Sequence, residues 1–293
     1  MKALTMTLAL ALAAAPAAAQ QPADYEPSLQ RLTDNLYMLT GRGGNLAISL
    51  GDDGIVLIDD QYAQIAERNL EAIRTLSDAP LAFVLNTHWH GDHTGGNERM
   101  AGQGALIIAH DNVRVRLAAE QMREFMESQK ARIPAALPVV TFTETVTLHF
   151  NGEEVHAFHV PPAHTDGDAI VHFRNADVIH TGDIYFNGVF PFIDTNSGGS
   201  VQGTIDAVDR ILALCGPRTR LIPGHGPLSD CDGLRGYREL IVTVQGRIAA
   251  LIADGATVEE VVAANPAAGY ESWSWSFLPT DRWVGLIYAN MKQ

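Results

Sequence analysis

The segment VLNTHWHGDHTGGN, residues 84–97, constrains this chain more than any other feature of its sequence. Three histidines and an aspartate fall within six positions, at His88, His90, Asp92 and His93. Neutral imidazole and carboxylate are the ligands that suit Zn²⁺. The apolar residues that open the segment predict a strand, and a rigid strand can deliver these side chains from its end. An ordinary polar loop explains such a density of ligands poorly. The chain is therefore expected to end a strand beside a metal site.

Three further residues of ligand type each follow a short apolar run that predicts a buried strand. They are His164 after Val155–Val160, Asp183 after Val178–His180, and His225 after Arg220–Ile222. Loops at one edge of a sheet can bring such residues together, because rigid strands fix where each loop begins. Together with the four residues of segment 84–97, these three residues predict a single metal centre built from seven side chains.

The other apolar runs alternate between strand and helix periodicity. Strands are expected at Leu36–Leu39, Asn45–Leu50, Gly54–Asp59, Leu81–Leu85, Ala105–Ala109, Val146–Phe150 and Ala169–Phe173. Helices are expected at Tyr62–Leu76, Asn112–Lys130, Val201–Leu214, Leu234–Leu251, Thr257–Ala264 and Thr280–Asn290, the last capped by Thr280 or Asp281. This order predicts a mixed α/β fold with the helices outside. No Gly-, Pro- or Ser-rich linker divides the chain, so residues 20–293 are interpreted as one domain with C-terminal helices.

The first 19 residues have the layout of a secretory signal peptide. Lys2 precedes an apolar run from Ala3 to about Ala15, and Ala17–Ala19 fits an A-x-A cleavage site. The apolar run is too short for a comfortable membrane span, so no span is expected after cleavage. The mature chain is therefore expected to be periplasmic or secreted.

The chain is strongly acidic, with 34 acidic and 20 basic residues and a net charge of −14. This charge repels phosphate backbones, so nucleic acid is excluded as a partner and a small-molecule substrate is expected. Cys215 and Cys231 either form a disulfide or stay as two buried thiols. A disulfide would close a loop of about 17 residues and contribute roughly 3 kcal/mol. The sequence does not give the oligomeric state.

The motif H-x-H-x-D-H, which begins at His88, resembles the signature of the metallo-β-lactamase superfamily. The later residues of ligand type fill its remaining positions, and the resemblance covers roughly residues 34–240. It implies a four-layer αβ/βα sandwich with a metal site at one edge of two sheets. It also implies two zinc ions. One would be held by His88, His90 and His164, the other by Asp92, His93 and His225, with Asp183 as the bridging ligand.

The same resemblance implies hydrolysis by a metal-bound hydroxide. Two divalent cations that share a water lower its pKa from about 15.7 toward about 7, which produces a nucleophile at neutral pH. Asp92 is expected to accept a proton from the water and pass it to the leaving group. The aromatic segment Asp183–Ser200 is expected to line the substrate through Tyr185, Phe186 and Asn187, with core packing as the equal alternative for the phenylalanines. Tyr185 or Asn187 is expected to donate a hydrogen bond to the developing oxyanion.

Residues that differ between branches of the superfamily indicate which metal and which reaction this chain favours. The position of His90 is a glutamate in the flavodiiron branch, so zinc is favoured over a redox di-iron site. Metallo-β-lactamases usually carry Cys or Ser where Asp183 stands, which brings this chain closer to glyoxalase II and the lactonases. The residues after His225 lack an evident basic cluster for glutathione, and an export signal does not suit a cytosolic glyoxalase.

The favoured function is an exported dinuclear zinc hydrolase that cleaves a carbonyl–heteroatom bond. A β-lactam is the leading substrate, because of location and compact size. The alternatives are a lactonase or glyoxalase II-like thioesterase, a hydrolase of phosphate or sulfate esters, and a non-enzymatic zinc-binding accessory protein of a periplasmic pathway. The loops around the ligands offer few Arg or Lys residues, which counts against an anionic ester.

Residues beside the ligands are expected to orient them. Asp59 ends a predicted strand and either accepts an N–H from a ligand histidine or only terminates a turn. The residues expected to orient the ligand loops are Thr87, Thr165 and Asp168. The histidines expected to be structural are His110, His149, His156, His159, His172 and His180. Trp273–Trp275 and Trp283 are expected in the core rather than at the mouth of the pocket.

Overall fold

The structure, a computed structural model, describes residues 25–128 and 136–292, so the expected signal peptide lies outside the described residues. The first sheet has seven strands that follow chain order. They are β1 Ser28–Arg31, β2 Leu36–Thr40, β3 Leu46–Gly51, β4 Gly54–Ile58, β5 Leu81–Leu85, β6 Leu106–His110 and β7 Val140–Phe142. Strands β1 to β4 pair antiparallel, whereas β4 to β7 pair parallel. The parallel strands therefore end at one common edge.

The second sheet has six strands in the order β13-β12-β11-β10-β9-β8. They are β8 Thr145–Phe150, β9 Glu153–His159, β10 Ala169–Phe173, β11 Val178–His180, β12 Arg220–Ile222 and β13 Ser229–Asp230. Strands β9 and β11 are both antiparallel to β10, and β12 is parallel to β11. The loops that follow β9, β11 and β12 therefore leave the sheet at the same edge.

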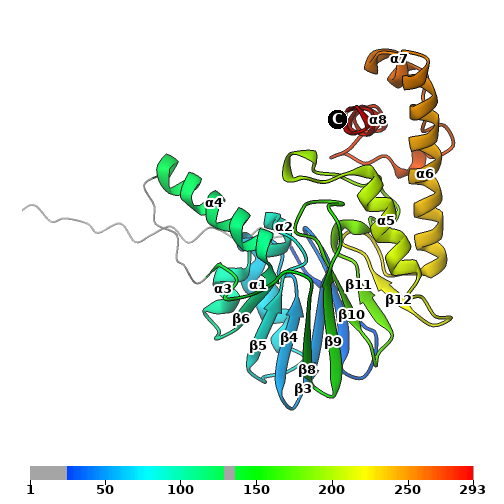
Figure 1. The fold of residues 1–293 in the computed structure, drawn as a ribbon. Coiled ribbons are helices and arrows are strands. Elements are labelled where there is room, and N and C mark those ends of the chain that lie inside the picture. The colour runs from blue at the N-terminus through cyan, green and yellow to red at the C-terminus, as the bar shows by residue number, and fades with distance from the viewer. Residues whose placement is uncertain (1–24, 129–135, 293) are drawn as a thin grey trace, which may run out of the picture.

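The two sheets lie against each other with helices outside them (Figure 1). Clusters of buried apolar side chains hold these layers together. Between the sheets, Val56 and Leu85 of the first sheet pack in one cluster with Val171 and Ile222 of the second. The first sheet is covered by α1 Ala66–Arg74 and α3 Asn97–Ala101, and the second by α5 Val201–Leu212 and α6 Cys231–Ala253. Helices α7 Val258–Ala263 and α8 Thr280–Met291 pack against α6. The expected αβ/βα sandwich is confirmed. Within the described ranges, no helix has both the length and the apolar character needed to cross a membrane.

Side-chain caps fix where two of the later helices begin. The carboxylate of Asp230 accepts hydrogen bonds from the backbone N–H groups of Asp232 and Gly233, so α6 begins earlier than its apolar spacing predicts. Thr257 and Glu260 form a capping box at the start of α7. The polar residues that begin these helices are therefore as informative as the apolar stripes.

The start of α8 differs from expectation. The expected cap at Thr280 or Asp281 is wrong, because Thr280 is already the first helical residue and Pro279 stands before it. The backbone N–H of Thr280 instead donates to the hydroxyl of Ser274. A side chain from the preceding loop thus accepts from the first N–H group of this helix.

Other differences concern short or exposed elements. The expected helix Tyr62–Leu76 begins as the 3₁₀ turn η1, Ala63–Ile65, before it becomes α1. Helix α4 spans Asp111–Ser128, and the end expected at Lys130 lies outside the described residues. Strands β1, β7 and β13 have no counterpart among the expected strands. All three lie at the edges of their sheets.

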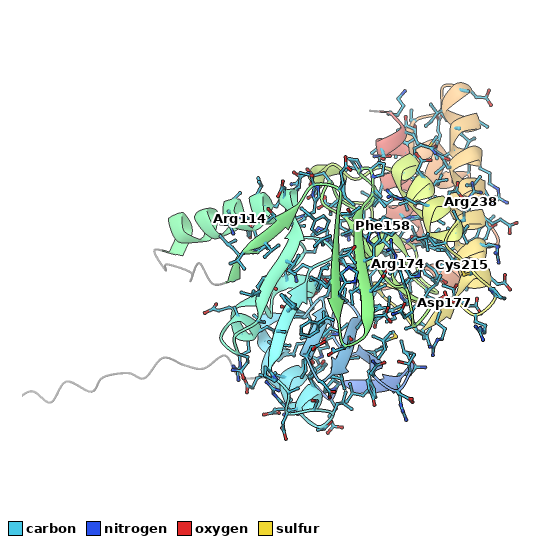
Figure 2. The ribbon with its side chains drawn as sticks, turned by 60° about the horizontal axis from the view of Figure 1, so that its bottom comes forward. Arg114, Phe158, Arg174, Asp177, Cys215 and Arg238 are labelled. Carbon is cyan, nitrogen blue, oxygen red and sulfur yellow. A yellow bond between two sulfur atoms is a disulfide. The ribbon has the colours of Figure 1, made fainter. Side chains whose placement is uncertain are left out.

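Cys215 and Cys231 form a disulfide, which decides between the two alternatives left by the sequence. Their Cα atoms are 6.1 Å apart. Cys215, labelled in Figure 2, follows α5. Cys231 is the first residue of α6. The bond therefore joins two helices that cover the second sheet.

Candidate metal centre

The seven expected ligands converge at one edge shared by the two sheets. His88 and His90 lie in the loop after β5, and Asp92 and His93 lie in the short helix α2, Gly91–Thr94. The second sheet contributes His164 after β9, Asp183 in the 3₁₀ turn η3 (Gly182–Ile184) after β11, and His225 after β12. Strand direction, which places these loops at one edge, is what brings the residues together.

The first cluster consists of His88, His90, His164 and Asp183, whose ligand atoms all lie within 4.8 Å of one another. Nε2 of His164 is 2.9 Å from Nδ1 of His90 and 3.4 Å from Oδ2 of Asp183. Nε2 of His88 is 3.8 Å from the same carboxylate oxygen. Three of the four residues are buried and His90 is partly exposed, so the cluster can be reached from the His90 side.

The second cluster consists of Asp92, His93 and His225. Nε2 of His225 is 3.3 Å from Oδ2 of Asp92 and 3.4 Å from Oδ2 of Asp183. The other carboxylate oxygen of Asp183, Oδ1, is 3.1 Å from Nε2 of His93. One carboxylate thus faces both clusters. Although burial raises the pKa of Asp183, the surrounding histidines hold it well below its usual range.

Three of the cluster histidines have a hydrogen-bond acceptor behind the ring. These contacts are His90 Nε2 to Asp194 Oδ2 at 3.0 Å, His93 Nδ1 to Asp59 Oδ2 at 2.7 Å, and His164 Nδ1 to the Phe192 carbonyl at 2.7 Å. Carboxylate and carbonyl oxygens only accept, so we assign the proton to the nitrogen that faces them. The opposite nitrogen of a neutral ring then presents a lone pair to the cluster.

The resulting donor set fits divalent metal ions. Burial lowers the pKa of His164 to about 4, so its ring is neutral near pH 7. The lone pairs of His164 Nε2 and His90 Nδ1 therefore face each other across 2.9 Å. Nε2 of His88 is also buried without a hydrogen-bond partner. Facing lone pairs repel one another, and unpaired polar atoms are costly to bury unless a cation satisfies them.

Asp59 and Thr87 connect the two clusters. Oδ1 of Asp59 accepts from the Thr87 backbone N–H, and Oδ2 accepts from the Thr87 hydroxyl. Oδ2 is also the atom that faces His93, while the Thr87 hydroxyl lies 3.1 Å from Nδ1 of His88. The contact expected between Asp59 and a histidine of the cluster is present, and Thr87 extends it to a second histidine.

Asp168 holds the loop that carries His164. Its carboxylate accepts from the backbone N–H groups of His164 and Thr165 and from the Thr165 hydroxyl. Burial raises the pKa of Asp168 to about 7, against the lowering effect of these hydrogen bonds. The expected orienting roles of Asp168 and Thr165 agree with this geometry.

A cavity of about 500 Å³ opens over the two clusters. Its lining is Gly43, Tyr62, His90, Gly91, Asp92, Asp183, Phe186, Phe192, His225, Trp275 and Phe277. In the part of the chain that the structure describes, no Lys or Arg lines this cavity. Its volume and its mixture of aromatic and polar groups suit a small molecule.

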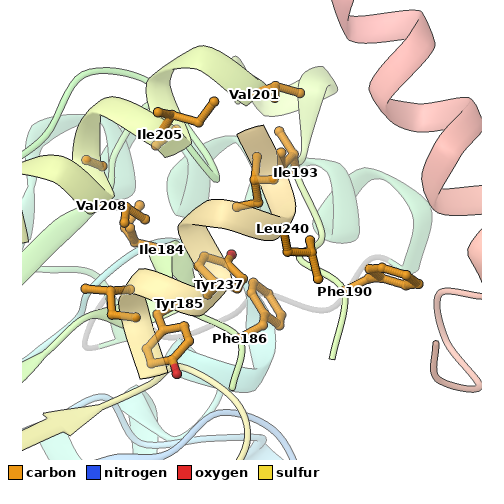
Figure 3. Close-up of a cluster of buried hydrophobic side chains, with 14 of the residues drawn as sticks. Ile184, Tyr185, Phe186, Phe190, Ile193, Val201, Ile205, Val208, Tyr237 and Leu240 are labelled. Carbon is orange, nitrogen blue, oxygen red and sulfur yellow. The ribbon is translucent and has the colours of Figure 1, made fainter. Parts of the chain in front are cut away.

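Tyr185 and Asn187 do not line this cavity. Tyr185 is fully buried beside Tyr237, with ring centroids 5.0 Å apart (Figure 3). Its hydroxyl bonds the side chains of Asn187 and Ser229, and the amide of Asn187 donates to the Pro227 carbonyl. The expected oxyanion contact from Tyr185 or Asn187 therefore has no geometric support, because their polar groups are bound elsewhere.

The aromatic lining differs in part from expectation. Phe186 lines the cavity as expected, but the placement of Trp275 in the core is wrong, because it lines the cavity too. Trp283 is buried as expected and stacks on Phe190 at 4.1 Å. Phe192, from the segment Asp183–Ser200 that was expected to line the substrate, also lines the cavity. Tyr62 and Phe277 in the lining and Asp194 behind His90 were not predicted, because single residues on loops carry no periodicity.

The six other histidines belong to neither cluster among the described residues. His110 stacks on His159 at a centroid distance of 3.9 Å, and its Nε2 lies 3.1 Å from the Thr143 carbonyl. Nε2 of His180 lies 2.9 Å from the Asn45 carbonyl. These contacts agree with the structural roles expected for them.

Comparison with known proteins agrees with this geometry. The family described as the metallo-beta-lactamase superfamily matches residues 43–226. The chain is 27% identical over 158 residues to a hydroxyacylglutathione hydrolase of Pelagibacter ubique (strain HTCC1062), a match that covers 53% of each protein. The chain therefore spans about half the length of this curated relative.

Solved structures show the same fold. A metallo-beta-lactamase from Pontibacter korlensis superposes with a TM-score of 0.62 at 19% identity, covering 74% of this chain and 99% of that one. The stereoselective inverting sec-alkylsulfatase Pisa1 from Pseudomonas sp. gives a TM-score of 0.67 at 18% identity, covering 89% of this chain and 50% of that one. At such low identity these likenesses show the fold alone. Because the family match spans more than half of the sequence, this chain belongs to the metallo-β-lactamase superfamily.

Proposed function

We propose that this chain is an exported dinuclear zinc hydrolase that cleaves a carbonyl–heteroatom bond in a small-molecule substrate. Members of its superfamily are mostly metal-dependent hydrolases. The observation that carries the proposal is the convergence of two groups of histidine and carboxylate ligand atoms at Asp183, with the lone pairs of His90 and His164 facing each other and Nε2 of His88 buried without a partner. These ligand types suit zinc. Bound zinc ions would supply an activated water and polarise the substrate carbonyl.

The proposed division of ligands follows the two clusters. His88, His90 and His164 are assigned to one zinc, Asp92, His93 and His225 to the other, and Asp183 to both. Asp92 is a carboxylate that both lines the cavity and faces His225. In that position it can take a proton and return it to the leaving group.

The lining of the cavity bears on the substrate. β-Lactam antibiotics and glutathione thioesters carry carboxylates, which proteins usually bind with Arg or Lys. The described lining offers neither. This observation favours a lactone or an ester, while the β-lactam proposed from location and compact size remains a substrate to be tested.

Export forms part of the proposal. It rests on the signal-peptide layout of residues 1–19 and is supported by the disulfide between Cys215 and Cys231, because such bonds persist in oxidising compartments. N-terminal sequencing of the protein from the periplasm or the medium should begin at Gln20. A protein that keeps Met1 and stays in the cytoplasm would contradict export.

The proposed activity is tested with zinc-loaded protein and a panel of a β-lactam, a γ-lactone, a phenyl ester and S-lactoylglutathione. Turnover of at least one is expected. Asp183→Asn removes the shared carboxylate charge and should lower kcat/KM by more than the roughly 100-fold that loss of an outer partner can cost. Asp206→Asn, on the exposed face of α5, is the matched control and should leave kcat/KM unchanged.

Two outcomes would contradict the hydrolase. Zinc binding without turnover of any substrate in the panel would indicate the non-enzymatic accessory protein instead. Equal activity of the Asp183→Asn variant and the parent would remove the metal centre from the reaction.

A further inference from the structure

An aromatic wall, made of Phe186, Phe192, Trp275 and Phe277, forms one side of the cavity. The ring centroids of Phe192 and Phe277 are 5.4 Å apart, and those of Phe277 and Trp275 are 5.1 Å apart. Those of Trp275 and Phe186 are 6.3 Å apart. Each spacing is within the range of direct aromatic contact, so the four rings form one continuous surface.

The two ends of the aromatic wall reach the two metal clusters. Phe186 stacks on His225 of the second cluster, with centroids 5.1 Å apart and an interplanar angle of 12°. The ring of Phe192 is 6.2 Å from that of His90 in the first cluster. A group that lies on the wall is therefore held beside both proposed metal positions.

The protein itself keeps the wall in place. The indole N–H of Trp275 donates to the carbonyl of Phe190, and the backbone N–H of Phe190 donates to the carbonyl of Trp273. Phe190 also stacks on the buried Trp283. These contacts tie the C-terminal segment to the loop after η3, so the wall exists before any substrate binds.

The aromatic wall is apolar, uncharged and open. The side chain of Phe277 is 45% exposed, although it stands beside the metal centre. Arg282 stacks on Phe277 but is not part of the lining. Gly91 belongs to the same lining. No atom lies within 4 Å of the position that a Cβ atom on Gly91 would occupy, so a ligand has room there. Exposed apolar surface of this kind marks a ligand groove.

We propose that Trp275 and Phe277 select an ester or lactone whose acyl group is an uncharged aryl or long alkyl chain. The proposal rests on the hydrolase function proposed above. In that reaction the oxygen of water bonds to the carbonyl carbon and the acyl–oxygen bond breaks. The leaving oxygen takes a proton from the water. An ester gives a carboxylic acid and an alcohol, and a lactone gives one hydroxy acid. Both selecting residues lie outside the family match of residues 43–226, so the selectivity belongs to the C-terminal part of this chain.

The test compares three methyl esters with one leaving group: methyl acetate, methyl phenylacetate and methyl (4-carboxyphenyl)acetate. With zinc-loaded full-length protein, kcat/KM should be about 10- to 100-fold higher for phenylacetate than for acetate, because one phenyl group is buried on the wall. The carboxylated ester should lose most of this gain, because its carboxylate must leave water for a lining that contains no Lys or Arg. Phe277→Ala should lower the ratio of kcat/KM for phenylacetate to kcat/KM for acetate about tenfold.

Two variants serve as controls for folding and for nonspecific loss of apolar surface. Trp275→Phe keeps an aromatic ring but loses the indole N–H bond to Phe190. It should keep most of the preference, because the backbone bond from Phe190 to Trp273 remains. Leu214 is 39% exposed and lies outside the lining. Leu214→Ala should therefore keep the whole preference for phenylacetate. A ratio in Phe277→Ala equal to that of the parent would overturn the proposal.

A binding measurement separates failure of the wall from failure of the hydrolase. Saturation-transfer NMR with phenylacetamide and acetamide measures binding to the aromatic wall and does not depend on turnover. We expect a signal for phenylacetamide with the parent protein and its loss with Phe277→Ala, and no signal for acetamide. A phenylacetamide signal that is absent from the parent, or unchanged in the variant, would overturn the wall whether or not any ester is hydrolysed. Loss of ester turnover with normal phenylacetamide binding would contradict the hydrolase alone.

Discussion

The position of one proton decides whether each histidine of the centre can bind a metal ion. The proton of His90 is held on Nε2 by the carboxylate of Asp194, which lies 104 residues away in the sequence. Asp194 is itself fixed, because its carboxylate accepts from the Ser197 hydroxyl and caps the 3₁₀ turn η4, Thr195–Ser197. Burial raises the pKa of Asp194, but the hydrogen bonds from His90 and Ser197 lower it well below its usual range. An ionised acceptor therefore holds the His90 proton away from the cluster.

Removal of this acceptor should weaken the first zinc site. Asp194→Ala leaves the proton of His90 free to move to the inward nitrogen, and we expect a loss of about 10- to 100-fold in zinc affinity. Competition with a chromogenic chelator measures it, and Asp206→Asn provides the control. An affinity equal to that of the parent would mean that Asp194 only caps the 3₁₀ turn.

The seven clustered residues could be predicted from sequence because their spacing and their places at strand ends are local features. Asp194 and Trp275 could not, since their partners are distant in the chain. The error at Tyr185 has a geometric cause. Tyr185 has extended backbone angles and Phe186 forms a bridge with His225. Adjacent side chains in extended backbone point to opposite sides, so Phe186 faces the cavity and Tyr185 faces the core.

At the scale of elements, buried strands were the easiest to predict. Strands β5, β10, β11 and β12 begin and end where their apolar runs predict. The strands missed, β1, β7 and β13, are edge strands with few buried side chains, so they give little apolar signal. These missed strands did not affect the prediction of the site, because its residues follow strands that were predicted correctly.

The disulfide should stabilise the pair of helices that covers the second sheet. Replacement of both Cys215 and Cys231 by serine should lower the free energy of unfolding by about 3 kcal/mol, because the loop between them is no longer closed in the unfolded chain. Urea denaturation of the variant and the parent measures the difference. Equal midpoints and slopes would show that the bond does not constrain the unfolded state.

At the scale of the whole molecule, the net charge differs in sign from the charge expected at the cavity. The chain carries a net charge of −14, yet two zinc ions would focus positive charge at one edge of the sheets. The clustered metal-facing residues lie within the family-matched segment 43–226, whereas Trp275 and Phe277 come from the C-terminal part. The aromatic wall therefore joins Phe186 and Phe192 of the family-matched segment to Trp275 and Phe277 of the C-terminal part.

The central claim is that the seven clustered residues hold two zinc ions. X-ray diffraction from crystals of the zinc-loaded protein, with anomalous data collected at the zinc edge, tests it most directly. We expect two anomalous peaks roughly 3.5–4 Å apart. One should lie among His88, His90 and His164, the other among Asp92, His93 and His225, and the Asp183 carboxylate should contact both. A single peak, or no peak at these residues after saturation with zinc, would contradict the account.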